Sequence, residues 1–327
     1  MYICIVFIIY NYLISTAIAI SGGSTVEKSR QYPFFVTLTS PTLCGGSIIS
    51  LDPPWILTAA HCMERLNIEH PNECVVAYGN RHSSLQTYTT VKRAIPHPLY
   101  LSTQQQAQHQ VFPTDRTNFI PYDIGLLELN EPLEASLYVN RIPIILENET
   151  RTEGHRTMGM GYTGYKEPYA DVLQTTECNI INAELLKNNN FNQSVILATS
   201  NASLCHGDSG SPLIGYHENK YYLEGILNRI LFAYDPEPDD STCPFHESNS
   251  SPFINTFVKP SIHLQWILNV TQLSKNDLTI DPEASNHYDI KDSNTFISSS
   301  TSLLLKHGFL SIHSQSFIII FLLYLLS

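Results

Sequence analysis

Short apolar runs of strand length recur along this chain of 327 residues, separated by polar or turn-forming residues. Residues 55–60 form one such run and lead directly into His61, residues 124–129 follow Asp123, and residues 212–214 lie just after Ser209. Residues 173–181 alternate loosely between apolar and polar positions; two similar runs are residues 75–79 and 221–227. Short runs bounded by turn formers are typical of strands in a packed core. The pattern therefore predicts strands at these positions.

The first 19 residues form a different pattern, a short apolar run that ends in Ala17-Ile18-Ala19. Such a run, closed by small residues at a cleavage position, is typical of a secretory signal peptide. A membrane anchor is the alternative, but Asn11 interrupts the run, which is also short for a bilayer span. We therefore expect a signal peptide over residues 1–19, cleavage after Ala19, and secretion.

Two polar stretches also depart from the strand pattern. Residues 102–110 are polar and without periodicity, which predicts a long surface loop. After about residue 273 the composition becomes rich in Ser, Asn and Asp, which predicts a polar linker over residues 273–300.

The last 27 residues, 301–327, form a hydrophobic tail. Its uninterrupted part, residues 317–326, is too short to cross a bilayer as a helix, which takes about 20 residues. Small residues at 298–302 precede it, and this order is typical of a GPI-attachment signal, although the spacer is long and contains Leu303-Leu304-Leu305. The tail therefore predicts a glycolipid anchor at the outer cell surface.

Composition narrows the class of protein further. Hydrophobic residues make up 43% of the chain, enough for a packed core in one large domain or two ordinary ones. Charged residues make up only 15% and form no basic block, so we expect no nucleic-acid partner. The formal net charge of -12 bears on solubility and steering, not on fold. Nothing in the sequence calls for a cofactor or a metal ion.

Candidate chemistry centres on Ser209, which lies between glycines in Gly207-Asp208-Ser209-Gly210. A serine hydroxyl is a poor nucleophile near neutral pH and needs a neighbouring base and donors for the developing oxyanion. Gly207 allows a turn that directs its N–H inward, beside the N–H of Ser209. The same string also makes ordinary surface turns. His61 and Asp123 also have interpretations without catalysis, His61 as a histidine in the core and Asp123 as an acidic cap at the end of a strand.

The three motifs together resemble the trypsin/chymotrypsin family of serine proteases, in the order His, Asp, Ser. The resemblance covers about residues 20–272, which we take as a trypsin-like protease domain. It implies an all-β fold of two antiparallel six-stranded β-barrels with a C-terminal helix, which matches residues 262–268. It also implies that Ser209 attacks the peptide carbonyl, His61 transfers the proton and Asp123 orients His61, while the N–H groups of Gly207 and Ser209 hold the oxyanion.

The resemblance extends to activation, because Ile20-Ser21-Gly22-Gly23 is similar to the mature N-terminus of the family. It implies that the free ammonium of Ile20 turns inward and pairs with Asp208, shaping the oxyanion turn. Cleavage after Ala19 would expose Ile20 directly, without a separate activating protease.

Seven cysteines are present, of which Cys4 falls in the leader. The resemblance implies two disulfides, Cys44–Cys62 and Cys205–Cys243. For Cys74 and Cys178 the sequence leaves two alternatives, a further disulfide or two buried free thiols. Five glycosylation sequons fit a secreted chain, at Asn148, Asn192, Asn201, Asn249 and Asn269.

The specificity pocket departs from the family pattern. The resemblance places Ser203 at the pocket floor, where trypsin-like enzymes carry an aspartate. It also places Ile230 and Phe253 at two positions of the pocket wall where the family usually has glycine. Arg229 stands where a tryptophan usually lines the substrate, and Ser211 replaces a glycine. We expect a peptide-bond endohydrolase of narrow specificity, with protein or peptide substrates and serine protease inhibitors as partners. The alternative is a non-catalytic binding protein of the protease fold with an occluded pocket.

Overall fold

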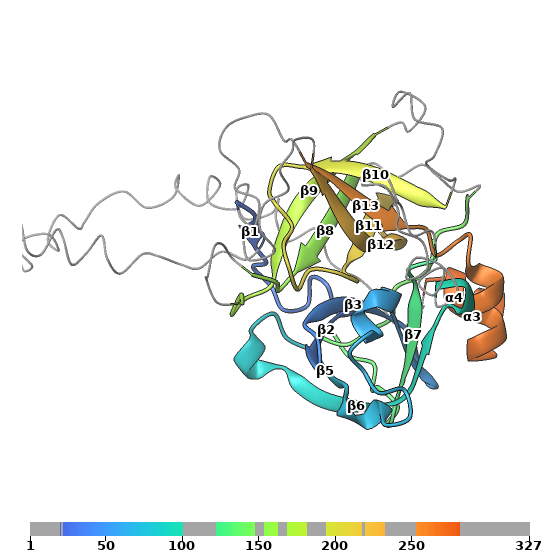
Figure 1. Cartoon of the computed structure of the whole chain (residues 1–327). Helices are drawn as coiled ribbons and strands as arrows, with labels where there is room; N and C mark the ends of the chain where they lie inside the picture. The colour runs from blue at the N-terminus through green and yellow to red at the C-terminus, as the bar shows by residue number, and fades with distance from the viewer. Residues whose placement is uncertain are drawn as a thin grey trace, which may run out of the picture. The chain divides into compact units, whose positions relative to one another are not determined.

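The computed structural model describes residues 20, 22–100, 122–147, 154–162, 169–181, 194–217, 220–232 and 253–281. Figure 1 shows two groups of strands, one from each half of this region. The leader, the loop at 102–110 and the apolar tail lie outside the described residues.

The first half forms a closed antiparallel barrel in the order β2-β3-β4-β7-β6-β5. Its strands are β2 (Phe35–Ser40), β3 (Cys44–Leu51), β4 (Pro54–Thr58), β5 (Val75–Tyr78), β6 (Thr87–Pro96) and β7 (Gly125–Leu129). Every residue of β4 and of β7 is buried, which explains why these two strands are largely apolar in sequence. The charged exception in β7, Glu128, pairs with Lys92 and Arg93.

The second half forms the other barrel, in the order β9-β10-β13-β12-β11-β8, closed by pairing of β8 with β9. Its strands are β8 (Gly154–Gly159), β9 (Gln174–Ile181), β10 (Val195–Ser200), β11 (Pro212–His217), β12 (Lys220–Phe232) and β13 (Phe253–Val258). A short strand, β1 (Ser24–Thr25), pairs with β9. The predicted fold of two six-stranded antiparallel barrels is therefore confirmed.

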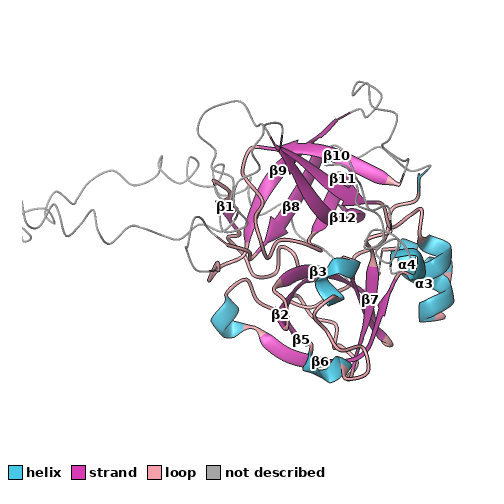
Figure 2. Ribbon diagram, in the orientation of Figure 1, coloured by secondary structure: helices cyan, strands magenta, loops and turns pink. Residues whose placement is uncertain are grey.

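Helices are few, as Figure 2 shows. Three short 3₁₀ turns, η1 (Ala60–Met63), η2 (Pro71–Glu73) and η3 (Ser83–Leu85), lie in the first half of the chain. The expected C-terminal helix is α3 (Leu264–Thr271), which ends at Gln272 in the left-handed conformation. Among the described residues, none of the helices combines the length and apolar character that a bilayer crossing requires.

The described structure continues past residue 272, where we expected the linker to begin. Helix α4 (Lys275–Thr279) starts with a capping box between Ser274 and Asp277. Leu278 is fully buried in the main core, and its carbonyl accepts a hydrogen bond from Ile144 N at 2.8 Å. The sequence of this segment does not predict a packed helix, because Leu278 has mainly polar neighbours and one apolar residue makes no periodicity.

Candidate active site

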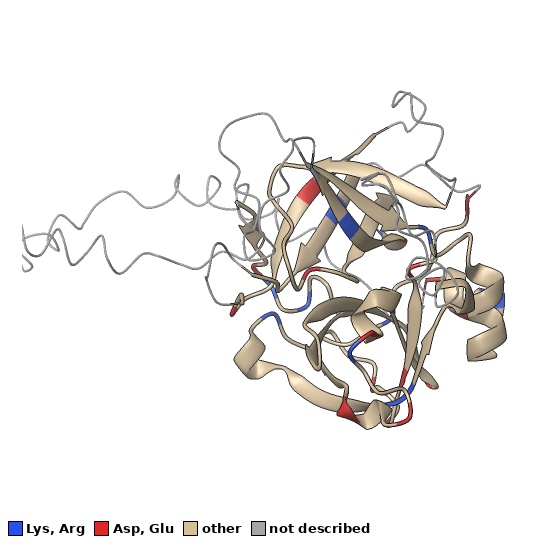
Figure 3. Ribbon diagram, in the orientation of Figure 1, with Lys and Arg blue, Asp and Glu red and all other residues tan. Residues whose placement is uncertain are grey.

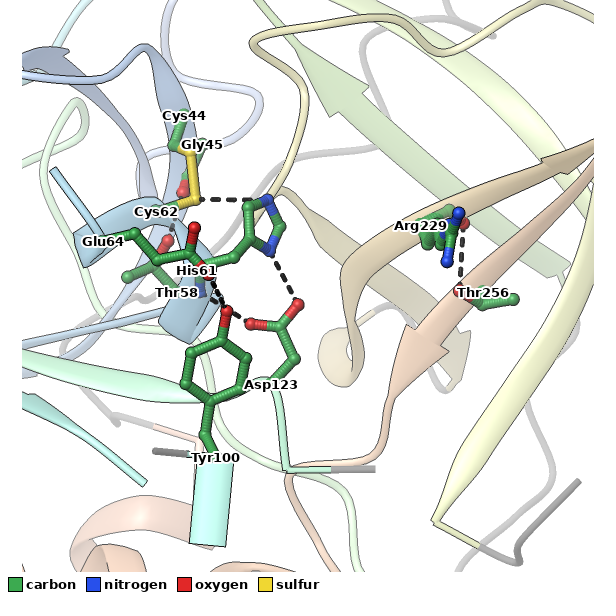
Figure 4. A network of polar contacts seen from close by, with 10 residues as sticks. All are labelled: Cys44, Gly45, Thr58, His61, Cys62, Glu64, Tyr100, Asp123, Arg229 and Thr256. Atoms are coloured by element: carbon green, nitrogen blue, oxygen red, sulfur yellow. Dashed lines mark hydrogen bonds and ion pairs between the residues drawn. A yellow bond between two sulfur atoms is a disulfide. The ribbon is translucent and has the colours of Figure 1, made fainter. Parts of the chain in front are cut away.

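Residues before and after His61 in the sequence attach its backbone to the first barrel (Figure 4). The buried strand β4 ends at Thr58, whose hydroxyl donates to the carbonyl of Gly45 on β3 at 2.7 Å. His61 follows in η1, and the disulfide between Cys62 and Cys44 joins η1 to β3. Two links to the same strand therefore fix the backbone that carries the imidazole.

Asp123 binds both the ring and the backbone of His61. Oδ2 of Asp123 lies 2.7 Å from Nδ1 of His61, and the backbone N–H of His61 donates to Oδ1 at 2.8 Å. The aspartate side chain is 3% exposed and that of His61 is 29% exposed. Asp123 reaches this position because β7, two residues later, pairs with β4. An imidazole oriented in this way keeps the proton on Nδ1 and leaves Nε2 to act as a base.

A second carboxylate influences His61. Burial lowers the pKa of His61, but the charge of Asp123, its hydrogen bond and the charge of Glu64 together leave that pKa raised. The buried hydroxyl of Tyr100 donates to Oε1 of Glu64, so the carboxylate is held near the site (Figure 4). This arrangement could not be predicted from the sequence, since Glu64 and Tyr100 are 36 positions apart.

Ser209 lies where the two barrels meet. Its carbonyl accepts a hydrogen bond from Gly45 N of the first barrel at 2.7 Å, and Gly210 N donates to Leu227 O of the second at 2.8 Å. A Cβ atom on Gly210 would lie 2.3 Å from Thr58 Oγ1, so only glycine fits beside the end of β4. Among the described residues, however, no hydrogen bond joins Ser209 Oγ to Nε2 of His61.

The turn before Ser209 offers two backbone donors. The carbonyl of His206 accepts from Tyr162 N at 2.8 Å. Because N–H and C=O of a trans peptide point in opposite directions, the N–H of Gly207 points away from Tyr162. Neither this N–H nor that of Ser209 donates to any described residue. Gly207 has a φ of +92°, and a Cβ there would lie 2.5 Å from Leu43, so the turn requires glycine.

Asp208 lies fully buried beneath this turn. Its carboxylate accepts from Gly161 N at 2.8 Å and from Cys205 N at 2.9 Å. A Cβ on Gly159 would lie 2.0 Å from Oδ1, so Gly159-Met160-Gly161 forms a niche that only glycines leave open. Burial raises the pKa of Asp208 to about 7, against the effect of the two N–H donors.

Among the described residues, no cation pairs with Asp208, and Ile20 is here joined to the residue before it. The Ile20 side chain is fully buried in a cluster that includes Ala202, Leu204 and Leu227. The side chain of Ile20 therefore packs in the core of the second barrel. Its backbone nitrogen is part of a peptide bond and carries no charge. The pairing of Ile20 with Asp208 stays a prediction, and the glycine niche around Asp208 was not expected from the sequence.

The expected pocket residues are only partly described. Ser203 is 2% exposed, and its hydroxyl has no hydrogen-bond partner in the described structure. Ile230 is half-buried and packs against the cluster that contains Ala202 and Leu204, the neighbours of Ser203. Phe253 pairs through its backbone with Phe232 at the end of β12, and its side chain lies outside the described structure.

The space for the side chain of Ser211 depends on the absence of a side chain at Gly45. A Cβ on Gly45 would lie 2.1 Å from Ser211 Oγ, a buried atom without a hydrogen-bond partner in the part of the chain described. The side chain of Ser211 therefore fits only because residue 45 is a glycine.

The cysteines fall into three sets. Cys44 and Cys62 are bonded, and Cys205 is in a disulfide whose expected partner, Cys243, lies outside the described residues. Cys74 and Cys178 are free and buried in separate core clusters, so they do not pair. Burial raises the pKa of each thiol to about 12, which leaves both unreactive near neutral pH.

One group of metal-ligand types adjoins the site. The donor atoms of Cys44, His61 and Cys62 lie within 4.8 Å of one another. Because the two sulfurs are bonded to each other, neither is a thiolate, and one imidazole alone makes no metal site. Of the expected sequons, Asn201 and Asn269 are exposed, and the other three, at Asn148, Asn192 and Asn249, lie outside the described residues.

Comparison with known proteins agrees with this architecture. Residues 20–236 match the sequence model of the Trypsin family. This chain belongs to the trypsin family. It is similar to human transmembrane protease serine 5, with 27% identity over 224 residues that cover 64% of this chain and 45% of that protein. It is also similar to rabbit coagulation factor IX, with 28% identity over 228 residues, 64% of this chain and 74% of that protein. The chain thus spans less than half of the human relative.

Proposed function

We propose that this chain is a serine endopeptidase that uses Ser209, His61 and Asp123. The observation that carries the proposal is the pair of uncommitted N–H donors at Gly207 and Ser209, beside a histidine already held by an aspartate. Donors left without partners beside a nucleophile are what a developing oxyanion requires.

In the proposed reaction Ser209 Oγ adds to the peptide carbonyl while its proton passes to Nε2 of His61. The carbonyl oxygen becomes an oxyanion held by the two N–H groups, and Asp123 stabilises the imidazolium. The carbon–nitrogen bond then breaks, and His61 returns the proton to the leaving amine. Water, activated by His61, hydrolyses the remaining ester and regenerates Ser209.

Covalent labelling tests this function directly. A fluorophosphonate should label the wild-type protein and Ser211→Ala, because the crowded hydroxyl of Ser211 is buried. Ser209→Ala should not be labelled, and should retain only the ~10³–10⁴-fold rate over water that binding and the oxyanion donors supply. Failure of the folded wild type to react would favour the alternative, a binding protein with an occluded pocket.

We also propose that the protein is secreted, N-glycosylated, and held at the outer cell surface by a glycolipid attached near Ser300. The support is the leader over residues 1–19, the five sequons, and the short apolar run over residues 317–326. Phosphatidylinositol-specific phospholipase should release the protein from expressing cells. Retention at the surface with the tail peptide still present would contradict the anchor.

A further inference from the structure

In the part of the chain that the structure describes, strand β12 has an open edge near the candidate nucleophile. Its pairing with β11 ends at Pro212 and Ile226, whereas its pairing with β13 continues to Phe232. Beyond Leu227, which bonds to Ser211 and Gly210, residues 228–232 are therefore paired on one side only within the described structure. An extended peptide can add to such an edge as a further strand.

Arg229 lies on this one-sided stretch. The strand register shifts between Leu227 and Arg229, and bulges of this kind re-aim side chains. Asn228 is buried and Ile230 packs against the core, whereas Arg229 is exposed. The carbonyl of Arg229 accepts from the hydroxyl of Thr256 on β13 at 2.9 Å, so its backbone is fixed (Figure 4).

The guanidinium of Arg229 makes no ion pair or hydrogen bond with any described residue. Figure 3 shows short Lys and Arg segments and short Asp and Glu segments scattered along the ribbon. The chain carries 18 Lys and Arg against 30 Asp and Glu, so its overall field repels acidic peptides. A preference for acidic peptides would therefore come from a local cation and not from net charge.

Strand geometry says which substrate residues meet Arg229. Under the proposed function, the expected pocket at Ser203 and Ile230 receives the side chain of the residue that supplies the cleaved carbonyl. Since side chains alternate along an extended chain, the second and fourth residues counted back from the cleaved bond face the other way, as Arg229 does.

Resting on the proposed function, we propose that Arg229 selects substrates with an acidic side chain at the second or fourth position before the cleaved bond. The guanidinium would bind that carboxylate at the open edge of β12. This assigns to the enzyme a class of substrate, acidic peptides with a small uncharged residue at the cleavage point.

Positional peptide libraries test this selection. The wild type should cleave peptides with Asp or Glu at one of these positions about two- to fivefold faster than Asn or Gln analogues, the size of a solvent-exposed ion pair. Arg229→Gln should remove the preference and Arg229→Glu should reverse it toward Lys. Lys275→Gln, which removes an exposed cation on α4, should keep it. Raising the salt concentration should weaken the wild-type preference.

The outcomes separate the two proposals. An enzyme that is labelled at Ser209 and cleaves peptides, but shows the same ratio in wild type and Arg229→Gln, overturns the role of Arg229 and leaves the proteolytic function intact. A wild type that neither reacts with the fluorophosphonate nor cleaves any peptide overturns both.

Discussion

Asp123 holds His61 at two points, with one oxygen 2.7 Å from ring Nδ1 and the other 2.8 Å from the backbone N–H. The two contacts fix both the ring orientation and the tautomer. Asp123→Asn keeps the volume but presents an N–H₂ group in place of an acceptor, so the proton on Nδ1 loses its partner. We expect kcat to fall by about 10⁴ near neutral pH, the size known for this exchange in proteases of this fold.

Asp171→Asn provides the matched control, because Asp171 is exposed and forms no part of the site. Steady-state kinetics with one peptide substrate should show a normal kcat for the control. An Asp123→Asn enzyme within tenfold of wild type would mean that catalysis does not depend on the orientation of His61 by Asp123.

Glu64→Gln should move the acidic limb of the pH profile. Because protonated His61 cannot accept the serine proton, kcat/KM rises as pH passes upward through the pKa of His61. The charge of Glu64 raises that pKa, so removing it should lower the pKa and shift the limb to lower pH. Glu69→Gln, another exposed carboxylate on the same segment, should leave the profile in place. A shift to higher pH in Glu64→Gln would contradict the assignment.

The disulfide between Cys44 and Cys62 should contribute both stability and precision. It closes a loop with a sequence separation of 18 and connects η1 to β3. Replacing both cysteines with serine should lower the free energy of unfolding by ~3 kcal/mol, by the loop-entropy estimate. Urea unfolding measures this loss. An unchanged midpoint would show that Thr58 and Asp123 alone hold the histidine segment.

Much of the fold was predictable because strands such as β4 and β7 are buried on both faces and are largely apolar in sequence. His61, Asp123 and Ser209 became candidates because each adjoins such a run and their three motifs together resemble one family, and their joint action in catalysis stays a prediction. The niche of Gly159 and Gly161 around Asp208 was not, because it depends on a contact between residues 47 positions apart. Helix α4 was missed because it docks through one side chain.

Leu278→Ala tests whether α4 belongs to the protease domain. Leu278 is fully buried against the core, so its truncation should lower the free energy of unfolding by ~2–4 kcal/mol. Lys275→Ala, on the exposed side of the same helix, should change stability by less than about 0.5 kcal/mol. Thermal or urea unfolding distinguishes the two. Equal stability of both variants would mean that the folded domain ends at α3.

Asp208 should titrate differently before and after cleavage in front of Ile20. While Ile20 is joined to the preceding residue, burial raises the pKa of Asp208 from 3.8 to about 7. The folded state then holds this proton more tightly than the unfolded state. The resulting stability is fully present below about pH 4 and is lost as pH rises to about 7. In a chain that begins at Ile20, the free ammonium should pair with the carboxylate, lower its pKa and remove the loss.

Urea unfolding between pH 4 and 7 compares the two forms, each carrying Ser209→Ala to prevent self-digestion. The longer form should become less stable across this range, and Asp208→Asn should reduce this loss of stability because residue 208 then takes up and releases no proton. The form that begins at Ile20 should keep its stability up to pH 7, and only this N-terminus should support full activity in the Ser209 enzyme. Parallel pH profiles for the two forms would show that Asp208 does not receive the ammonium, because pairing must change its pKa.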